Sequence, residues 1–226
     1  MELPVTLYCG AVRPLPPDGR PSAIIKDRVR GPIALDIGGL AGDQQADRRV
    51  HGGADKAVHL FPVTHYARLA AAVPEAADRL IAGSIGENIS VSGLDESTVR
   101  IGEVFALGTA RLQVSEPRSP CWKIDARYGV SGLTAFIAEH GCAGWYLRVL
   151  TAGVVQEDDR LRRLPDDPAG DPQAPTLAEF FTLWQHHRPD PGALETLAAL
   201  PALGGNWPRK LRERAAWLRA NPPAAD

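Results

Sequence analysis

Short apolar runs separated by glycines fill the first 164 residues of this 226-residue chain, and they restrict the fold more than any other feature. The clearest run spans residues 144–150, where one face is formed by Trp145, Leu147 and Val149. Further strands are predicted at residues 5–9, 33–37, 99–107, 111–115 and 154–155. Helices are predicted at residues 64–73 and 131–140. Many short strands with few helices predict a mainly β fold, a barrel or sandwich with peripheral helices.

The composition changes near residue 165. Residues 164–175 read LPDDPAGDPQAP and hold four prolines and three aspartates. This stretch has a stiff backbone and little to bury, so the sequence predicts a linker at residues 165–175 after a β domain at residues 1–164.

Helical patterning returns in residues 176–226. Thr176 and Glu179 form a capping-box pair at the start of a first helix, a second is predicted at residues 192–200, and a third begins after Asn206. The apolar faces of the first and third helices are formed by Leu177, Phe180, Phe181, Trp184, Leu211, Ala215 and Leu218. The sequence therefore predicts a three-helix C-terminal extension, which at about 50 residues is marginally stable alone and should dock on another surface.

The charge balance and the cysteine count argue against several classes of protein. Lys plus Arg number 25 and Asp plus Glu number 27, so a strongly basic nucleic-acid-binding surface has no support. Three cysteines are typical of a reducing compartment with free thiols. The sequence also lacks a signal-peptide pattern at its start and an apolar run of about 18 residues. We therefore expect a cytoplasmic protein without a nucleic-acid or membrane partner.

Two glycine-rich segments are candidates for ligand binding. In residues 39–61, Gly52 and Gly53 follow His51 directly, and their N–H groups could cradle an anion, although a polar hairpin loop explains them equally well. The segment GSIGENIS at residues 83–90 is, by itself, typical of an ordinary tight turn.

Cys121 lies in a third polar segment, SEPRSPCWKID at residues 115–125. The two prolines on its N-terminal side favour an extended loop, and Arg118 and Lys123 favour the thiolate over the thiol. These features suit a nucleophile or a soft-metal ligand. Cys9 and Cys142 have no such cationic neighbours and are interpreted as small packed thiols.

The chain carries no C-x-x-C pair, H-E-x-x-H, phosphate-binding P-loop or dinucleotide fingerprint. A cysteine hydrolase using Cys121 and His51 stays open, with no local signature to support it.

Together the polar segments resemble a MOSC domain, the domain named after the C-terminal part of molybdenum cofactor sulfurases, in its stand-alone bacterial form. The resemblance covers nearly the whole chain. It is carried by PSAI at 21–24, GDQQAD at 42–47, VHGGADKAVHLF at 50–61, GENIS at 86–90, PRSPCWK at 117–123 and the three-helix extension. It implies a β-barrel fold, a molybdenum–pterin cofactor and reduction of N-hydroxylated compounds, such as hydroxylated purine bases, to amines.

The resemblance implies the role of Cys121, and the chemistry of the other residues suggests how they would serve the same cofactor. The matched cysteine, Cys121, is expected to be the molybdenum ligand, and a thiolate suits that metal. The anionic cofactor is expected to contact Gly52, Gly53, Lys56, Arg118 and Lys123. His51 would titrate near neutrality and is the first candidate for proton delivery, with Glu87 or Asp43 second. Asn88 could orient the substrate or the pterin.

Two alternative functions stay open. The chain could hold the cofactor or sulfur on Cys121 as a carrier without turnover, or it could be the cysteine hydrolase. A reductase would need a separate electron donor, expected to be a flavoprotein, because no flavin, nicotinamide or iron–sulfur signature is present in the sequence.

The extension likewise has two interpretations. It could brace the barrel or a second subunit of a homodimer, or its basic residues could dock the electron donor. Those basic residues are Arg209, Lys210, Arg212, Arg214 and Arg219.

Overall fold

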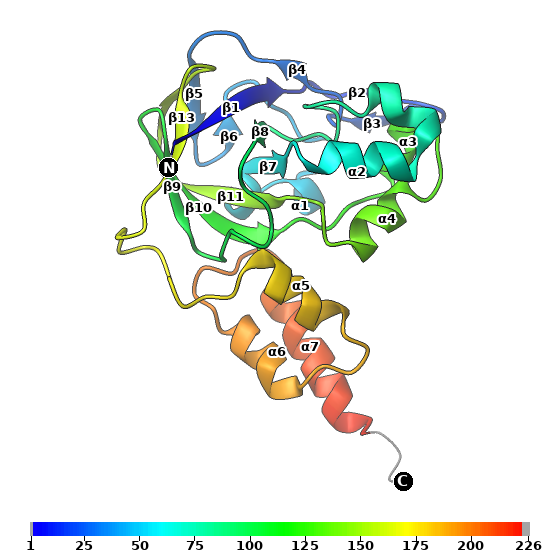
Figure 1. The fold of residues 1–226 in the computed structure, drawn as a ribbon, viewed down its shortest axis with the longest axis vertical. Helices are drawn as coiled ribbons and strands as arrows, with labels where there is room; N and C mark the ends of the chain where they lie inside the picture. The colour runs from blue at the N-terminus through cyan, green and yellow to red at the C-terminus, as the bar shows by residue number, and fades with distance from the viewer. Residues whose placement is uncertain (1, 223–226) are drawn as a thin grey trace.

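A closed β-barrel forms the centre of the computed structural model, which describes residues 2–222 (Figure 1). Its strands pair in the order β13-β9-β10-β11-β7-β8-β1, and β13 pairs with β1 to close the ring. The pairings are antiparallel except for β7 with β8. In chain order the barrel strands are β1 (Glu2–Cys9), β7 (Val58–Pro62), β8 (Ile89–Val91), β9 (Val104–Leu107), β10 (Ala110–Pro117), β11 (Trp145–Thr151) and β13 (Arg160–Arg163). The predicted mainly β barrel is therefore confirmed.

Shorter strands lie around the barrel. One small sheet orders its strands β12-β5-β6, a hairpin joins β2 to β3, and β4 pairs with β1. These strands are β2 (Arg13–Leu15), β3 (Arg20–Ser22), β4 (Asp27–Arg28), β5 (Ile33–Asp36), β6 (Gly39–Leu40) and β12 (Gly153–Val155).

Short helices cover one side of the barrel, where Figure 1 shows α2, α3 and α4 grouped together. The helices of the first 164 residues are α1 (Arg48–His51), the 3-10 turn η1 (Ala54–Lys56), α2 (His65–Ala72), the 3-10 segment η2 (Pro74–Arg79), α3 (Lys123–Tyr128) and α4 (Leu133–Glu139). The predicted helices correspond to α2 and α4, whereas α3 was not expected, because the prolines before Cys121 favoured an extended loop. The helix begins only at Lys123, beyond their reach.

Strand alternation divides the buried side chains into two clusters. On β11, Trp145, Leu147 and Val149 point into the barrel and belong to the larger cluster. On β7, Leu60 belongs to that cluster, whereas Phe61 belongs to a second cluster beneath α2, α3 and α4. The outer barrel face at β7 is thus covered by helices.

Three helices form the C-terminal extension, which Figure 1 shows at one end of the barrel. They are α5 (Leu177–Gln185), α6 (Pro191–Ala198) and α7 (Trp207–Ala220). The predicted capping box is present, since Thr176 Oγ1 accepts from Glu179 N at 3.1 Å and Glu179 Oε2 accepts from Thr176 N at 2.7 Å. Asn206 occupies the N-cap position of α7, but its side chain makes no capping hydrogen bond.

The extension packs on the barrel. Phe180, Trp207 and Leu211 are buried in the same cluster as the barrel interior. The Trp207 indole N–H donates to the Pro117 carbonyl at 3.0 Å, directly at the end of β10. The extension therefore braces the strand from which the Cys121 loop leaves.

Two expectations near the extension need correction. The strand predicted at residues 99–107 begins only at Val104, because Gly102 takes a φ of 82° and turns the chain. The freed backbone then binds the start of the extension, with Ile101 N donating to the Pro175 carbonyl at 3.1 Å. The predicted linker is also more buried than expected, since the side chain of Ala174 within it is only 2% exposed.

Candidate functional site

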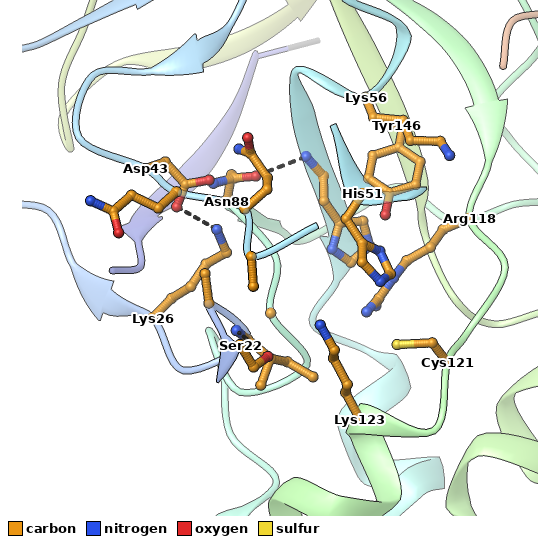
Figure 2. A pocket seen from close by; sticks show the side chains of 17 residues that line it. Ser22, Lys26, Asp43, His51, Lys56, Asn88, Arg118, Cys121, Lys123 and Tyr146 are labelled. Carbon is orange, nitrogen blue, oxygen red and sulfur yellow. Dashed lines mark hydrogen bonds and ion pairs between the residues drawn. The ribbon is translucent and has the colours of Figure 1, made fainter. Parts of the chain in front are cut away.

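A cavity lies on the outer side of the barrel, beside the helix-covered face. Of the ten residues predicted for the site, seven line it: Asp43, His51, Lys56, Asn88, Arg118, Cys121 and Lys123. Figure 2 shows the ends of the Arg118, Cys121 and Lys123 side chains pointing toward one another. Asp43 and Lys123, which are 80 positions apart in the sequence, thus line the same cavity.

The Cys121 loop is held at both ends by the backbone. At its start, Arg118 N donates to the Gly144 carbonyl at 3.1 Å, which ties the loop to the beginning of β11. At its end, the Cys121 carbonyl accepts from Ile124 N at 3.0 Å and from Thr134 Oγ1 at 3.2 Å. The Cys121 thiol is free and partly exposed at the cavity wall. The loop therefore presents a reduced sulfur at a fixed position.

Arg118 is a buried cation, only 6% exposed. Its Nη2 donates to the Ile85 carbonyl at 3.0 Å, but its Nη1 has no hydrogen-bond partner among residues 2–222. A buried guanidinium with one unsatisfied nitrogen is costly, so a site of this kind favours an anionic ligand that accepts a hydrogen bond from Nη1.

Asp43 and Lys26 form a buried ion pair on the opposite wall, with side chains 4% and 6% exposed. Asp43 also accepts from Gly10 N at 2.7 Å. These contacts fix the Asp43 carboxylate, and Figure 2 shows its pairing with Lys26. The sequence predicts Asp43 as a candidate proton donor, whereas in the structure its carboxylate neutralises the charge of Lys26.

His51 ends α1 and lies among cations. Burial, together with the positive charges of Lys123, Arg118 and Lys56, lowers its pKa to about 4. The expectation that His51 titrates near neutrality is therefore wrong for the protein without ligand. The imidazole is neutral at pH 7 and can donate one hydrogen bond and accept another.

Asn88 lines the cavity with its side-chain amide already engaged. Its Oδ1 accepts from His59 N at 3.0 Å, and its Nδ2 donates to the Tyr8 carbonyl at 3.2 Å. The amide thus joins β7 to β1, and only its remaining N–H is free to orient a ligand.

Glu87 does not line the cavity, although it was predicted as a proton donor. The carboxylate is fully buried and accepts hydrogen bonds from Gly83 N, Ile85 N, the Tyr66 hydroxyl and the Ser90 hydroxyl, at 2.6–3.0 Å. These hydrogen bonds hold the turn at residues 83–90. Glu87 therefore organises a loop, which corrects the prediction.

Gly52 and Gly53 are also absent from the cavity wall. Gly53 has a φ of 103°, and a side chain on Gly52 would approach the Arg48 backbone within 3.0 Å. Both glycines therefore let the chain turn from α1 into η1. The predicted anion cradle is replaced by side-chain cations, among them Lys56, whose Nζ donates to the Val50 carbonyl at 2.7 Å.

Several residues of the cavity wall were not predicted from the sequence. Lys26, His59 and Tyr146 line it, together with Ser22 and Gln44. His59 is buried, and its Nδ1 has no hydrogen-bond partner in the part of the chain that the structure describes. Burial, together with Arg118, holds its pKa well below the ordinary value. The polar residues His59 and Tyr146 within apolar strand runs were the signal that could have found them, because such positions face away from the core.

Chemically, the cavity combines one accessible thiol with three cations that are not neutralised by Asp43, namely Lys56, Arg118 and Lys123, while Lys26 is paired with Asp43. Such a set can bind an anion and offer sulfur to a soft metal. Among residues 2–222 there is no group of three or more His, Cys, Asp or Glu side chains placed to hold a metal ion.

The fold and this site define a MOSC domain protein. The family model, described as "MOSC domain", matches residues 47–162, and the chain belongs to this family. Within the family it is similar to Protein YiiM of Escherichia coli, with 36% identity over 95% of this chain and 93% of that protein. It is equally similar to protein YflK of Bacillus subtilis, 36% identical over 90% of both chains.

Solved structures agree with this assignment. The crystal structure of YiiM from Escherichia coli has a TM-score of 0.79 at 29% identity and covers 96% of this chain and 94% of that one. The YiiM structure from Geobacillus stearothermophilus has a TM-score of 0.75 at 26% identity, over 94% of this chain and all of that one. A protein named "Reductase" from Gibberella moniliformis is 35% identical over 63% of this chain. The matched region covers 26% of that protein's length.

In the described residues, no helix has the length and apolar character that crossing a membrane requires.

Proposed function

We propose that the protein is a molybdenum-cofactor-dependent reductase that converts N-hydroxylated compounds, such as hydroxylamino purine bases, to amines. The observation that carries the proposal is the meeting of the Cys121 thiol with the unpartnered Nη1 of buried Arg118 in one cavity. The MOSC family assignment and the similarity to a protein named "Reductase" support the same reaction class.

The residues present fit such a cofactor. The Cys121 thiolate would be the protein ligand to molybdenum, and thiolates are suitable donors to soft metals. Arg118, Lys123 and Lys56 would bind the anionic phosphate of the pterin, with Arg118 gaining the hydrogen bond that it lacks. The buried Lys26–Asp43 pair would shape the opposite wall without adding net charge.

The reaction consumes two electrons and two protons, R–NH–OH + 2e⁻ + 2H⁺ → R–NH₂ + H₂O. When bound, the molybdenum cofactor would supply the electrons that break the N–O bond. The chain would hold and orient the substrate, and neutral His51 would donate a hydrogen bond at the site. Electrons would come from a separate protein, a flavoprotein in this proposal.

The test is a molybdenum measurement on protein purified from a cofactor-competent host, beside Cys121→Ser. We expect close to one molybdenum per chain in the wild type and a large loss in the variant. Cys9→Ser is the matched control, because Cys9 is also a partly exposed free thiol but does not line the cavity. Cys121→Ser protein with full molybdenum and full activity would refute the ligand assignment.

An activity assay with an artificial electron donor separates the alternatives. The reductase reduces a hydroxylamino base to the amine. Wild-type protein that holds molybdenum and gives no amine is a carrier. Hydrolysis by molybdenum-free protein indicates the cysteine hydrolase.

A further inference from the structure

A second cavity adjoins the first on the other side of the Cys121 loop. The two cavities share four wall residues: His51, Lys56, Cys121 and Tyr146. The second cavity is completed by the end of β10 and by the first turn of α7, which contributes Trp207 and Lys210. Barrel and extension thus build it together.

Glu116 on β10 is the unusual group in this second cavity. The residue is 2% exposed, and its Oε1 has no hydrogen-bond partner among the described residues. Lys56 Nζ lies 3.6 Å from Oε1, which is beyond hydrogen-bond distance. A buried carboxyl oxygen without a partner, on a cavity wall, indicates a site for a hydrogen-bonding ligand.

The charges around Glu116 come from the elements packed on it. Its pKa is raised to about 7, mainly by burial and in part by Asp55 of η1, while the charges of Lys56 and Lys210 oppose the increase. The carboxyl group therefore changes between donor and acceptor near neutral pH.

Strand register places Glu116 in one row across the sheet with Tyr146 and His59, which line the first cavity. Glu116 pairs with Tyr146 across β10 and β11, and Tyr146 pairs with His59 across β11 and β7. The rings of Tyr146 and His59 lie 5.5 Å apart. Since His59 lines the first cavity, Glu116 the second and Tyr146 both, the row runs from one cavity to the other.

We propose that the second cavity is the substrate pocket, and that the Glu116 carboxyl group hydrogen-bonds to the hydroxylamino group of an N-hydroxylated base. This inference rests on the proposed function. With the cofactor in the cationic first cavity, the substrate approaches the Cys121 centre from the second. The first turn of α7 forms its outer wall, so the extension takes part in substrate binding as well as in stability.

The test compares Glu116→Gln holoprotein with the wild type by three measurements: molybdenum content, calorimetric binding of 6-hydroxylaminopurine to the oxidised protein, and kcat/KM as a function of pH. Hydrogen bonds to charged groups contribute enough that we expect at least about tenfold weaker binding and about tenfold lower kcat/KM, with molybdenum unchanged. The change in kcat/KM of the wild type near pH 7 should disappear in the variant.

Glu103→Gln is the matched control, because burial raises the pKa of Glu103 too, yet Glu103 lines neither cavity. A second variant guards against misfolding of Glu116→Gln. Asn206 is exposed, lines only the second cavity and makes no capping hydrogen bond, so Asn206→Trp should fold normally and narrow that cavity alone. We expect it to weaken base binding at least about tenfold as well, with molybdenum retained.

The outcomes separate the two proposals. Wild-type affinity and kcat/KM in both Glu116→Gln and Asn206→Trp overturn the inference and leave the reductase function in place. Wild-type protein that holds molybdenum but neither binds nor reduces the base overturns both.

Discussion

His51 shows how its neighbours change the chemistry of a single residue. An isolated histidine titrates near pH 6.5, and that value suggested a proton donor. The folded chain surrounds the imidazole with Lys56, Arg118 and Lys123 and buries it, so that the neutral form is favoured down to about pH 4. The same cations that make the cavity suitable for an anion therefore keep His51 unprotonated in the free protein.

This arrangement predicts the pH dependence of His51. In the cofactor-free protein, its imidazole should titrate near pH 4 by NMR, with the resonance assigned through His51→Gln. Addition of molybdate should raise the pKa, because a bound anion offsets the cations. Titration near pH 6.5 in the free protein would contradict the proposed environment.

The free energy of unfolding should depend on pH through the same shift in the His51 pKa. The unfolded chain binds a proton at His51 near pH 6.5 and the folded chain only near pH 4, so stability rises with pH within this window and is lost as the pH falls through it. His51→Gln should therefore lose less thermal stability than the wild type between pH 6.5 and pH 4.

At the scale of secondary-structure elements, the start of β11 holds the site together. Gly144 has a φ of 72°, and its carbonyl accepts from Arg118 N at 3.1 Å. A Cβ atom at this position would lie 2.2 Å from the Leu60 carbonyl oxygen of β7. Only glycine allows β11 to approach β7 this closely while it holds the Cys121 loop.

We predict that Gly144→Ala destabilises the protein more than Gly19→Ala. Gly19 has nearly the same φ, 71°, but no atom lies within 4 Å of a Cβ built there. Gly19→Ala should cost about 1–2 kcal/mol for the left-handed backbone alone, and Gly144→Ala should add the steric clash. Chemical denaturation measures both changes in the free energy of unfolding. Equal losses would mean that the approach of β11 to β7 is not constrained.

At the scale of the whole molecule, barrel and extension share one hydrophobic cluster. Trp207 is 4% exposed, packs edge-on against Phe180 with ring centroids 4.9 Å apart, and belongs to the cluster that fills the barrel. The backbone adds to this contact, since Gly204 N donates to the Ser115 carbonyl at 2.9 Å. Burial on this scale favours the interpretation of the extension as a brace, and we expect barrel and extension to unfold together.

Trp207→Ala should lower the free energy of unfolding by about 3–5 kcal/mol, the usual cost of removing a buried tryptophan. Trp217 lies on the same helix at 57% exposure, and Trp217→Ala should change stability by less than about 0.5 kcal/mol. Far-UV circular dichroism and tryptophan fluorescence should report one common transition in the wild type. Two separate transitions would show that the extension folds independently of the barrel.

Deletion of residues 176–226 tests the extension directly. Loss of solubility is the expected result, because the barrel side of the shared cluster becomes exposed. A soluble truncated protein that is active only with an artificial electron donor would instead favour a docking role for the basic residues of α7.

Much of the fold could be predicted because it depends on local patterns. Alternation along β11 and the capping box before α5 are properties of a few neighbouring residues, and both are present. Gly102 shows the limit of such patterns. Its left-handed conformation delays the strand predicted at residues 99–107 until Val104, and the backbone at Ile101 binds the extension instead. A run of apolar residues does not reveal where a glycine will turn the chain.

The candidate site also combines features that follow from local sequence with features that depend on tertiary contacts. By itself the sequence indicated a reactive Cys121 and the cations beside it, since residue type and near neighbours determine those properties. The tertiary structure decided which polar groups reach the cavity: it turned Glu87 and the Gly52–Gly53 pair into loop supports, and it brought Lys26, Tyr146 and Glu116 to the two cavities. The physical reason is that strand register and burial depend on contacts between residues far apart in the chain, and those contacts exist only once the barrel has closed.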